Sequence, residues 1–412
     1  MYNLLAILLG SLIGLTAAIP GLHTSVLLVG LLPILGIGGD FGACLVTSAM
    51  ASAVVASSLS KTFHPATRKT LNQATPEQAM TYRGEGLKAI DIQLTGIWTG
   101  LLFVLLAVTP LALAQFVFPD APKFVFTHFV QPVAPVVMLA YIVSVIWPAH
   151  NKLATIGVAF AGSIIGYIGL NHPALTQSSD AALGPLLAGV FSIPPLVMVL
   201  THRGRLAPIP HQRPAPAPTD LEVWPGLGAV AGMLTAVTAG IGSGAVVSAF
   251  AGQIPEDQYL SMHTASEAAN NGFAILLFVL IGAAHSGSAV AIQRAQSAPD
   301  PWLAFLLIAC IIAGVLISTL VTQKGVGPYV LLVAKIPQRA TAAGVLALTL
   351  GLVAHEAGAM GLGVAALAAL LGLIARAQSV PNQALASVLT GPILIYQLGL
   401  SPSLASSLGL LH

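Results

Sequence analysis

The chain has 412 residues, of which 56% are hydrophobic and only 7% charged, with a formal net charge of +2. A water-soluble domain carries about 25% charged residues, so this composition, with a mean hydropathy of +0.90, excludes a water-soluble protein. The small net charge gives no sign of a nucleic-acid partner or of a polybasic lipid anchor. The sequence therefore predicts an integral membrane protein that crosses the bilayer several times.

The membrane-spanning segments are expected to be helices. Runs such as 94–114 and 303–321 are free of charge and, at about 20 residues, are long enough to cross the bilayer core as helices. A β-barrel would alternate apolar and polar positions over about 10 residues, and no such alternation occurs. We expect an all-α polytopic membrane protein with about 10–12 transmembrane helices. The apolar segments lie near 3–19, 22–36, 41–60, 94–114, 130–147, 153–170, 183–200, 222–252, 264–284, 302–321, 339–354, 357–375 and 383–400.

The chain begins MYNLLAILLG, without the basic region or the cleavage site of a signal peptide, so the first apolar stretch is expected to be retained. The two cysteines, Cys44 and Cys310, lie in apolar contexts without CxxC spacing, which argues against a disulfide framework or a cysteine metal site.

The first apolar stretch is interrupted at Pro20-Gly21. Proline removes a backbone donor and glycine permits a turn, so the helix is predicted to unwind here at membrane depth. A new helix would start near Thr24, and its free N–H groups and positive dipole end would favour an anion. The competing interpretation is a simple proline kink between packed helices. The substrate-binding residues expected in this segment are Pro20, Gly21, His23, Thr24 and Ser25.

A second glycine-rich segment, 228–244, resembles the first in its small-residue spacing. Paired interruptions in corresponding halves of a chain point to the binding site of a transporter. The alternative is tight helix packing through small residues. The binding residues expected here are Gly240, Gly242, Ser243 and Gly244.

Between the two segments lies a Pro/Ala-rich stretch with three arginines, which cannot continue a helix. We expect residues 1–200 to form a first membrane repeat half, residues 201–221 a linker and residues 222–412 a second half. The positive-inside rule places the basic linker in the cytoplasm.

Residues 61–91 hold a large share of the charge, and Arg83 and Glu85 flank Gly84. These charges suit a solvated loop, but Arg83 beside a glycine bend could also form a wall of an anion path. Ser286 lies in the corresponding stretch of the second half, which ends in Ala-Ile as the first does. Both Arg83 and Ser286 are therefore candidate substrate-binding residues.

Ionisable and amide side chains inside apolar segments are functional candidates. Glu267, Asn270 and Asn271 lie one turn apart on one helix and could bind a coupling cation or relay a proton, although an asparagine can also simply bridge helices. His355 and Glu356 are expected in a short loop at the membrane interface. No HExxH, GxSxG or P-loop motif is present, so we expect neither an enzyme nor a cofactor, apart from coupling Na⁺ or H⁺.

Four stretches together resemble the large permease subunit of tripartite tricarboxylate transporters, and more closely a prokaryotic and archaeal branch of predicted permeases similar to it. The stretches are GSLIGLTAAIPGLHTS at 10–25, HPATRKTLNQATPEQAMTYRGEGLKAI at 64–90, SGSAVAI at 286–292 and VLTGPILIYQLG at 388–399. The resemblance implies a multi-pass permease of a prokaryotic inner membrane with two related repeats and the interrupted segments at the substrate site. It also implies a small membrane subunit and a periplasmic binding protein as partners, and we expect a homodimer. The second glycine-rich segment lacks the Pro-Gly of the first, so an organic anion is a safer inference than citrate.

Three functions are compatible with these features. The leading hypothesis is a secondary-active permease for a small carboxylate, coupled to H⁺ or Na⁺. The alternative is a translocase for polyprenyl-phosphate or a related lipid phosphate, whose head group would use the same anion pocket. A non-transporting membrane scaffold explains the hydrophobicity but leaves the paired interruptions without a reason.

Overall fold

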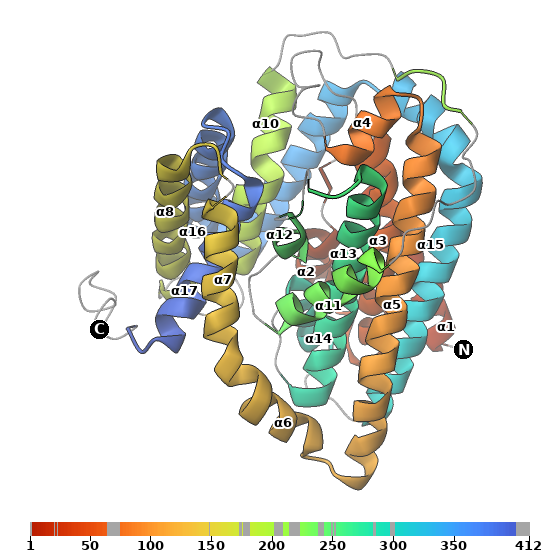
Figure 1. Ribbon diagram of the computed structural model, residues 1–412, viewed down its shortest axis with the longest axis vertical. Helices are drawn as coiled ribbons and strands as arrows, with labels where there is room; N and C mark the ends of the chain where they lie inside the picture. The colour runs from red at the N-terminus through yellow and green to blue at the C-terminus, as the bar shows by residue number, and fades with distance from the viewer. Residues whose placement is uncertain are drawn as a thin grey trace.

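The computed structural model describes residues 2–19, 21–22, 24–63, 75–147, 149–172, 175, 182–201, 209–213, 223–237, 243–248, 250, 253–282, 286–296 and 301–400. Every regular element within these ranges is a helix, which confirms the predicted all-α class (Figure 1). The α-helices are α1 (Tyr2–Leu15), α2 (Thr24–Leu35), α3 (Gly39–Phe63), α4 (Pro76–Tyr82), α5 (Gly86–Val117), α6 (Ala121–Val125), α7 (Ala134–Ile146), α8 (Lys152–Asn171), α9 (Leu183–Leu187), α10 (Ile193–Thr201), α11 (Trp224–Ala236), α12 (Ser243–Ser248), α13 (Glu256–Ile281), α14 (Gly287–Ala295), α15 (Pro301–Lys335), α16 (Gln338–Ala377) and α17 (Ser387–Gln397). Shorter helical turns are η1 (Thr16–Ala18), η3 (Phe126–Val130), η4 (Gln131–Val133), η5 (Ala188–Ser192) and η6 (Asn382–Ala386).

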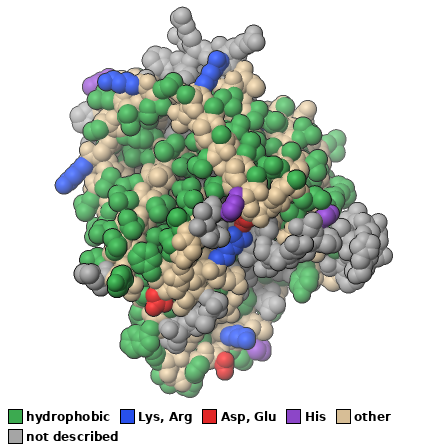
Figure 2. All heavy atoms as spheres, turned by 180° about the vertical axis from the view of Figure 1, so that it is seen from behind, with side chains coloured by type: hydrophobic (Ala, Val, Ile, Leu, Met, Phe, Trp, Pro, Cys, Tyr) green, Lys and Arg blue, Asp and Glu red, His purple; other side chains and the backbone are tan. Residues whose placement is uncertain are grey.

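Within the described ranges, seven helices are long and apolar enough to cross a membrane. An eighth span results if α6 and α7, which are bent by 55° at the break between them, are counted together. This is fewer than the 10–12 expected, because helices such as α1 and α2 end at breaks before they reach the length of a crossing. Many large apolar side chains are exposed on the spans, among them Leu102, Leu106 and Leu113 of α5. Figure 2 shows one such face, on which apolar side chains predominate.

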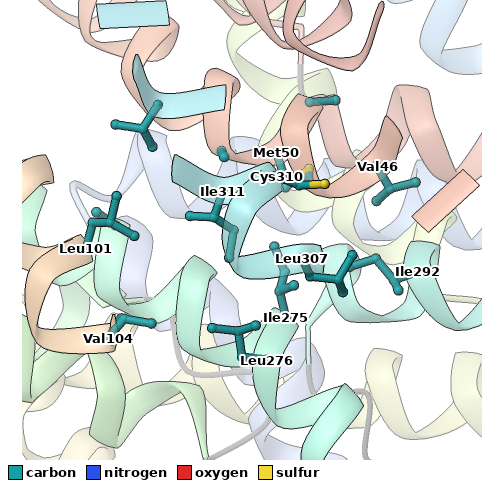
Figure 3. Packing of buried hydrophobic residues seen from close by; sticks show 14 of the residues in the cluster. Val46, Met50, Leu101, Val104, Ile275, Leu276, Ile292, Leu307, Cys310 and Ile311 are labelled. Carbon is teal, nitrogen blue, oxygen red and sulfur yellow. The ribbon is translucent and has the colours of Figure 1, made fainter. Parts of the chain in front are cut away.

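The larger core lies between α1, α3, α5, α13, α14 and α15. Both cysteines are buried in it as free thiols. Part of this packing is seen in Figure 3, where side chains from several helices meet. The residues labelled there are Val46, Met50, Leu101, Val104, Ile275, Leu276, Ile292, Leu307, Cys310 and Ile311.

Glycines let α1 lie directly on α3. A methyl group at Gly10 would come within 2.3 Å of the carbonyl oxygen of Leu45, and one at Gly14 within 2.3 Å of that of Ala49. Ser52 Oγ of α3 donates a hydrogen bond to the carbonyl oxygen of Ser11 at 2.9 Å. Small residues that bring two backbones together, with a polar side chain across them, are a usual way to join helices in a membrane.

The same contact recurs between α11 and α13. A methyl group at Gly228 would come within 2.0 Å of the carbonyl oxygen of Met262, and one at Gly232 within 2.2 Å of that of Ser266. In turn α13 packs on α5, as α3 packs on α15. The helices on either side of the linker thus make matching pairs.

A smaller core lies between α7, α8, η5, α16 and α17. It contains residues from both sides of the 201–221 linker, and so does the larger core. The two sequence halves are therefore interleaved in space and do not form two separate domains. That they are related repeats divided at 201–221 stays a prediction.

Helix α16 folds back on itself at Gly358, whose φ of 60° and ψ of −156° are not helical. Its 40 residues would extend about 60 Å as one straight helix, twice the thickness of a bilayer core. Leu196 of α10 packs with Ala342, and the neighbouring Pro194 lies against Gly372. Two points far apart on α16 therefore meet the same end of α10, so α16 consists of two arms of about 20 residues each, the length of one crossing.

The structure corrects the expected position of His355 and Glu356, which are helical and lie in α16 just before the bend at Gly358. His355 is exposed. Glu356 instead forms an ion pair with Arg294 of α14, with 2.7 Å between Oε1 and Nη1 and side chains only 12% and 17% exposed. This ion pair joins the two cores, because α14 belongs to the larger core and α16 to the smaller one.

Candidate functional site

The predicted break in the first apolar stretch is present. Helix α1 passes into η1, which ends at Ala18, and α2 begins at Thr24. Gly21 between them has a φ of +84°, a conformation that strains any residue with a Cβ atom. A methyl group there would also come within 2.7 Å of Leu196 Cδ2. Pro20 and His23 lie outside the described residues, so the break is defined by Gly21 and its neighbours.

The carbonyl groups freed at this break find partners on neighbouring helices. Ser60 Oγ of α3 donates to the carbonyl oxygen of Ala17 at 3.0 Å, and the hydroxyl of Tyr329 on α15 donates to that of Ala18 at 2.7 Å. Non-helical backbone is tolerated at membrane depth only where its polar groups are satisfied in this way or face a cavity. The break is thus stabilised by Ser60 and Tyr329, neither of which was predicted from the sequence.

Thr24 begins α2, as predicted, and is 4% exposed. Its hydroxyl has no hydrogen-bond partner among the described residues, so it does not cap the helix as expected. The same residue faces a cavity. A buried hydroxyl at the N-terminal end of a helix is left available to a ligand in that cavity.

The cavity beside the break has a volume of about 760 Å³. Its walls come from the first break, from α3, α10, α13, α15 and from the start of α16, and are largely apolar. The polar or charged residues that line it are Thr24, Ser57, Ser60, Lys61, Gln78, Glu267, Asn271, Tyr329, Gln338 and Thr341. A mostly apolar cavity with a few convergent polar groups is typical of a small-molecule site.

An ion pair lies in the cavity wall. Lys61 Nζ of α3 is 2.5 Å from Glu267 Oε2 of α13, and the two side chains are 34% and 24% exposed. Glu267 was predicted from the sequence but Lys61 was not, because Lys61 stands at the start of the charged stretch that was interpreted as a loop. It belongs instead to the last turn of α3. Its place in a long uncharged helix could have indicated Lys61, because α3 carries no charged residue between Asp40, near its start, and Lys61.

The two predicted amide residues play different parts. Asn271 lines the cavity and its Nδ2 donates to the carbonyl oxygen of Glu267 at 3.0 Å. Asn270 points to α11, where its Nδ2 donates to Thr235 Oγ1 at 3.0 Å. Asn270 therefore bridges two helices, which is the alternative that the sequence had left open.

The second glycine-rich segment lies largely outside the described residues, which include neither Gly240 nor Gly242. Helix α12 begins at Ser243, and a methyl group at Gly244 would come within 2.5 Å of His263 Nε2. Gly244 is not among the residues that line the cavity. The prediction that both interrupted segments meet at one site thus stays a prediction.

Arg83 and Ser286 also lie away from the cavity. Arg83 is about half exposed and pairs with Glu85 and Glu256. Ser286 caps α14, where its Oγ accepts a hydrogen bond from the backbone N–H of Ala289 at 3.2 Å. Over the described part of the chain, no three His, Cys, Asp or Glu side chains come together as metal ligands would.

Comparison with known proteins adds to this geometry. Residues 4–386 match the Tripartite tricarboxylate transporter TctA family. No curated protein and no solved structure matches the chain. The family match covers nearly the whole chain and agrees with the resemblance read from its motifs. The chain therefore belongs to the tripartite tricarboxylate transporter TctA family, and it is a multi-pass membrane transport protein rather than an enzyme.

Proposed function

We propose that the protein is a secondary-active permease for a small organic anion, a carboxylate, coupled to H⁺ or Na⁺. The observation that carries this proposal is one cavity that joins the broken helix at Gly21 and Thr24 to the ion pair of Lys61 and Glu267. Family membership supports transport of carboxylates. Family membership does not identify the particular substrate or the coupling ion, and both belong to this proposal.

In this proposal the carboxylate binds between the start of α2 and Lys61. The start of a helix attracts an anion through its free N–H groups and its dipole. The hydroxyl of Thr24 is buried there without a partner, and the ammonium group of Lys61 lines the same cavity. Pro20, His23 and Ser25 keep their predicted place in this substrate site.

The proposed coupling site is Glu267 with Asn271, both of which line the cavity. Asn270 supports it indirectly, since it fixes α13 against α11 through Thr235. Glu267 is the one acidic residue among the described residues that line the cavity. Movement of a cation to or from its carboxylate would therefore change the charge seen by the substrate.

We also propose that the chain consists of two related halves, 1–200 and 222–412. The matching pairs of α1 with α3 and of α11 with α13 support this, because both use two glycines four residues apart. The second interrupted segment, with Gly240, Gly242, Ser243 and Gly244, would then be the counterpart of the first. Arg83 and Ser286 were predicted as substrate-binding residues, but neither is among the residues that line the cavity, and the site proposed here does not include them.

Partners follow from the family, whose name describes a tripartite system. We propose a small membrane subunit and a periplasmic binding protein that delivers the anion, and a homodimer of this chain. The proposed place is the inner membrane of a bacterial cell.

The proposal is tested by uptake of labelled succinate and citrate into liposomes that hold the purified protein, under imposed H⁺ or Na⁺ gradients. Replacement Gly21→Val should abolish uptake, because the positive φ and the contact with Leu196 exclude a branched side chain. The control is Gly344→Val, at an exposed helical position where a methyl group meets nothing within 4 Å. Full activity of a well-folded Gly21→Val protein would refute the site.

The lipid-phosphate alternative is decided by the same preparation. Tight association of a polyprenyl phosphate with the purified protein, together with no uptake of either carboxylate, would favour it. Uptake of a carboxylate by protein free of such lipid would exclude it as the main function.

A further inference from the structure

The ion pair in the cavity wall contains one cation, Lys61, which could pair either with Glu267 or with a substrate carboxylate. Lys61 Nζ lies 2.5 Å from Glu267 Oε2, and both side chains line the cavity. A substrate carboxylate that binds the ammonium group would therefore lie beside the carboxylate of Glu267. Lys61 is also the one basic side chain among the described residues that line the cavity. Glu267 and a substrate carboxylate would therefore compete for the same partner.

The net charge of Lys61, Glu267 and the substrate carboxylate determines whether Glu267 must be protonated when the substrate binds. If an anion joined the pair unchanged, the cluster would carry a net negative charge among walls that are largely apolar, where an uncompensated charge is expensive. If Glu267 first takes a proton from the aqueous phase, the pair becomes an acid and a free ammonium ion, and one carboxylate restores neutrality. The cavity then holds either the Lys61–Glu267 pair or a protonated Glu267 with a Lys61–substrate pair.

We infer that a substrate carboxylate replaces Glu267 as the partner of Lys61, and that Glu267 carries one proton across the membrane with each carboxylate so bound. This inference rests on the proposed permease function and names its coupling ion as H⁺. It makes Lys61 the substrate-binding cation and Glu267 the proton carrier. Uptake should rise as the pH on the cavity side falls, because acid favours the protonated form of Glu267 that releases Lys61.

The groups around Glu267 are compatible with this role. Lys61 faces it from α3, and His263 lies one turn before it on α13 and acts on it electrostatically. Tyr259 lies a further turn away on α13, and both Glu267 and Glu77 of α4 act electrostatically on Tyr259. Asn271 donates to the backbone carbonyl of Glu267 and not to its carboxylate, which leaves the carboxylate oxygens to Lys61 or to a proton.

The empty protein must return across the membrane without substrate, and the pair makes this step feasible. With Glu267 ionised, Lys61 is neutralised internally. In the variant Glu267→Gln this neutralisation is lost, so the empty form would carry a partly buried, uncompensated cation. The substrate-loaded form of the variant carries the same charge as the loaded wild-type protein, in which Glu267 is protonated.

The test separates two transport modes in liposomes with labelled succinate and citrate. In wild type, an inward H⁺ gradient should drive accumulation and a Na⁺ gradient should not. Glu267→Gln should lose at least about 90% of this accumulation, yet exchange internal for external substrate at equal concentrations within about threefold of the wild-type rate, and without pH dependence. Lys61→Gln should lose both modes. The control Glu256→Gln, on the same helix but paired with Arg83 outside the cavity, should resemble wild type.

If Glu267→Gln does not fold, a measurement on wild type alone tests whether a proton enters with the substrate. A pH-sensitive dye trapped in the liposomes should report entry of protons with the substrate, and absence of this acidification would overturn the inference. Wild-type H⁺-driven accumulation by the Glu267→Gln protein, or accumulation that follows Na⁺, would overturn it while leaving the permease function intact. If wild type takes up neither probe, the proposed function fails and the inference falls with it.

Discussion

Single residues at the break show why it is stable within a membrane. The helix ends at Ala18, and its last carbonyl groups would be costly to bury without partners. Ser60 and Tyr329 supply those partners from two other helices. Gly21 supplies the left-handed turn that no residue with a side chain adopts without strain.

Replacement Tyr329→Phe tests this role. It removes the hydroxyl that donates to the half-buried carbonyl group of Ala18 while keeping the ring, and the net loss of one hydrogen bond costs about 0.5–1.5 kcal/mol. The thermal midpoint of the purified protein should therefore fall. The matched control is Tyr396→Phe, since Tyr396 is 76% exposed. Equal midpoints for the two variants would contradict the assigned role of Tyr329.

The sequence predicted the break but not the cation beside it. Pro20-Gly21 inside an apolar run is a local signal, and the structure has the turn and the new helix at Thr24 where that signal placed them. Lys61 is adjacent in sequence to the stretch predicted as a loop, but it faces Glu267 only because α3 and α13 pack together. Likewise, helical spacing placed Asn270 and Asn271 near Glu267 but could not tell which one faces α11.

Among the elements, the folded-back helix α16 has the most unusual position. Its first arm lines the cavity through Gln338, Thr341 and Ala342, and its second arm packs in the smaller core. The bend at Gly358 lies beside the ion pair of Arg294 and Glu356. That pair therefore fastens the bend of α16 to α14 and, through it, to the larger core.

Breaking this pair should destabilise the protein. Arg294→Gln removes the cation that pairs with the largely buried carboxylate of Glu356, and removal of one member of a buried pair costs up to about 3–5 kcal/mol. The free energy of unfolding of Arg294→Gln, measured in detergent, should fall accordingly. Arg83→Gln is the control, because its exposed ion pairs contribute about 0–1 kcal/mol. Similar small losses in both variants would show that the Arg294 pair does not fasten α16.

Across the whole molecule, composition and apolar runs predicted the class of protein, and the motifs predicted its family. Seven or eight spans among the described residues, with α16 counted once, compare with the 10–12 expected, because apolar composition alone does not show where a helix stops. In α16, the two predicted segments 339–354 and 357–375 correspond to the two arms on either side of the bend at Gly358. The interleaving of the two sequence halves could not be predicted either, since it depends on contacts between distant residues.

The central claim is that the transported carboxylate binds in the cavity at Lys61. The most direct test is equilibrium binding of labelled succinate and citrate to the purified protein, compared between wild type, Lys61→Gln and Arg83→Gln. Loss of Lys61 should weaken binding at least about tenfold, equivalent to about 1.4 kcal/mol, because the site then holds no cation among the described lining residues. Loss of Arg83, which is engaged by two surface carboxylates, should leave binding unchanged. Retained binding in Lys61→Gln together with lost binding in Arg83→Gln would contradict the account.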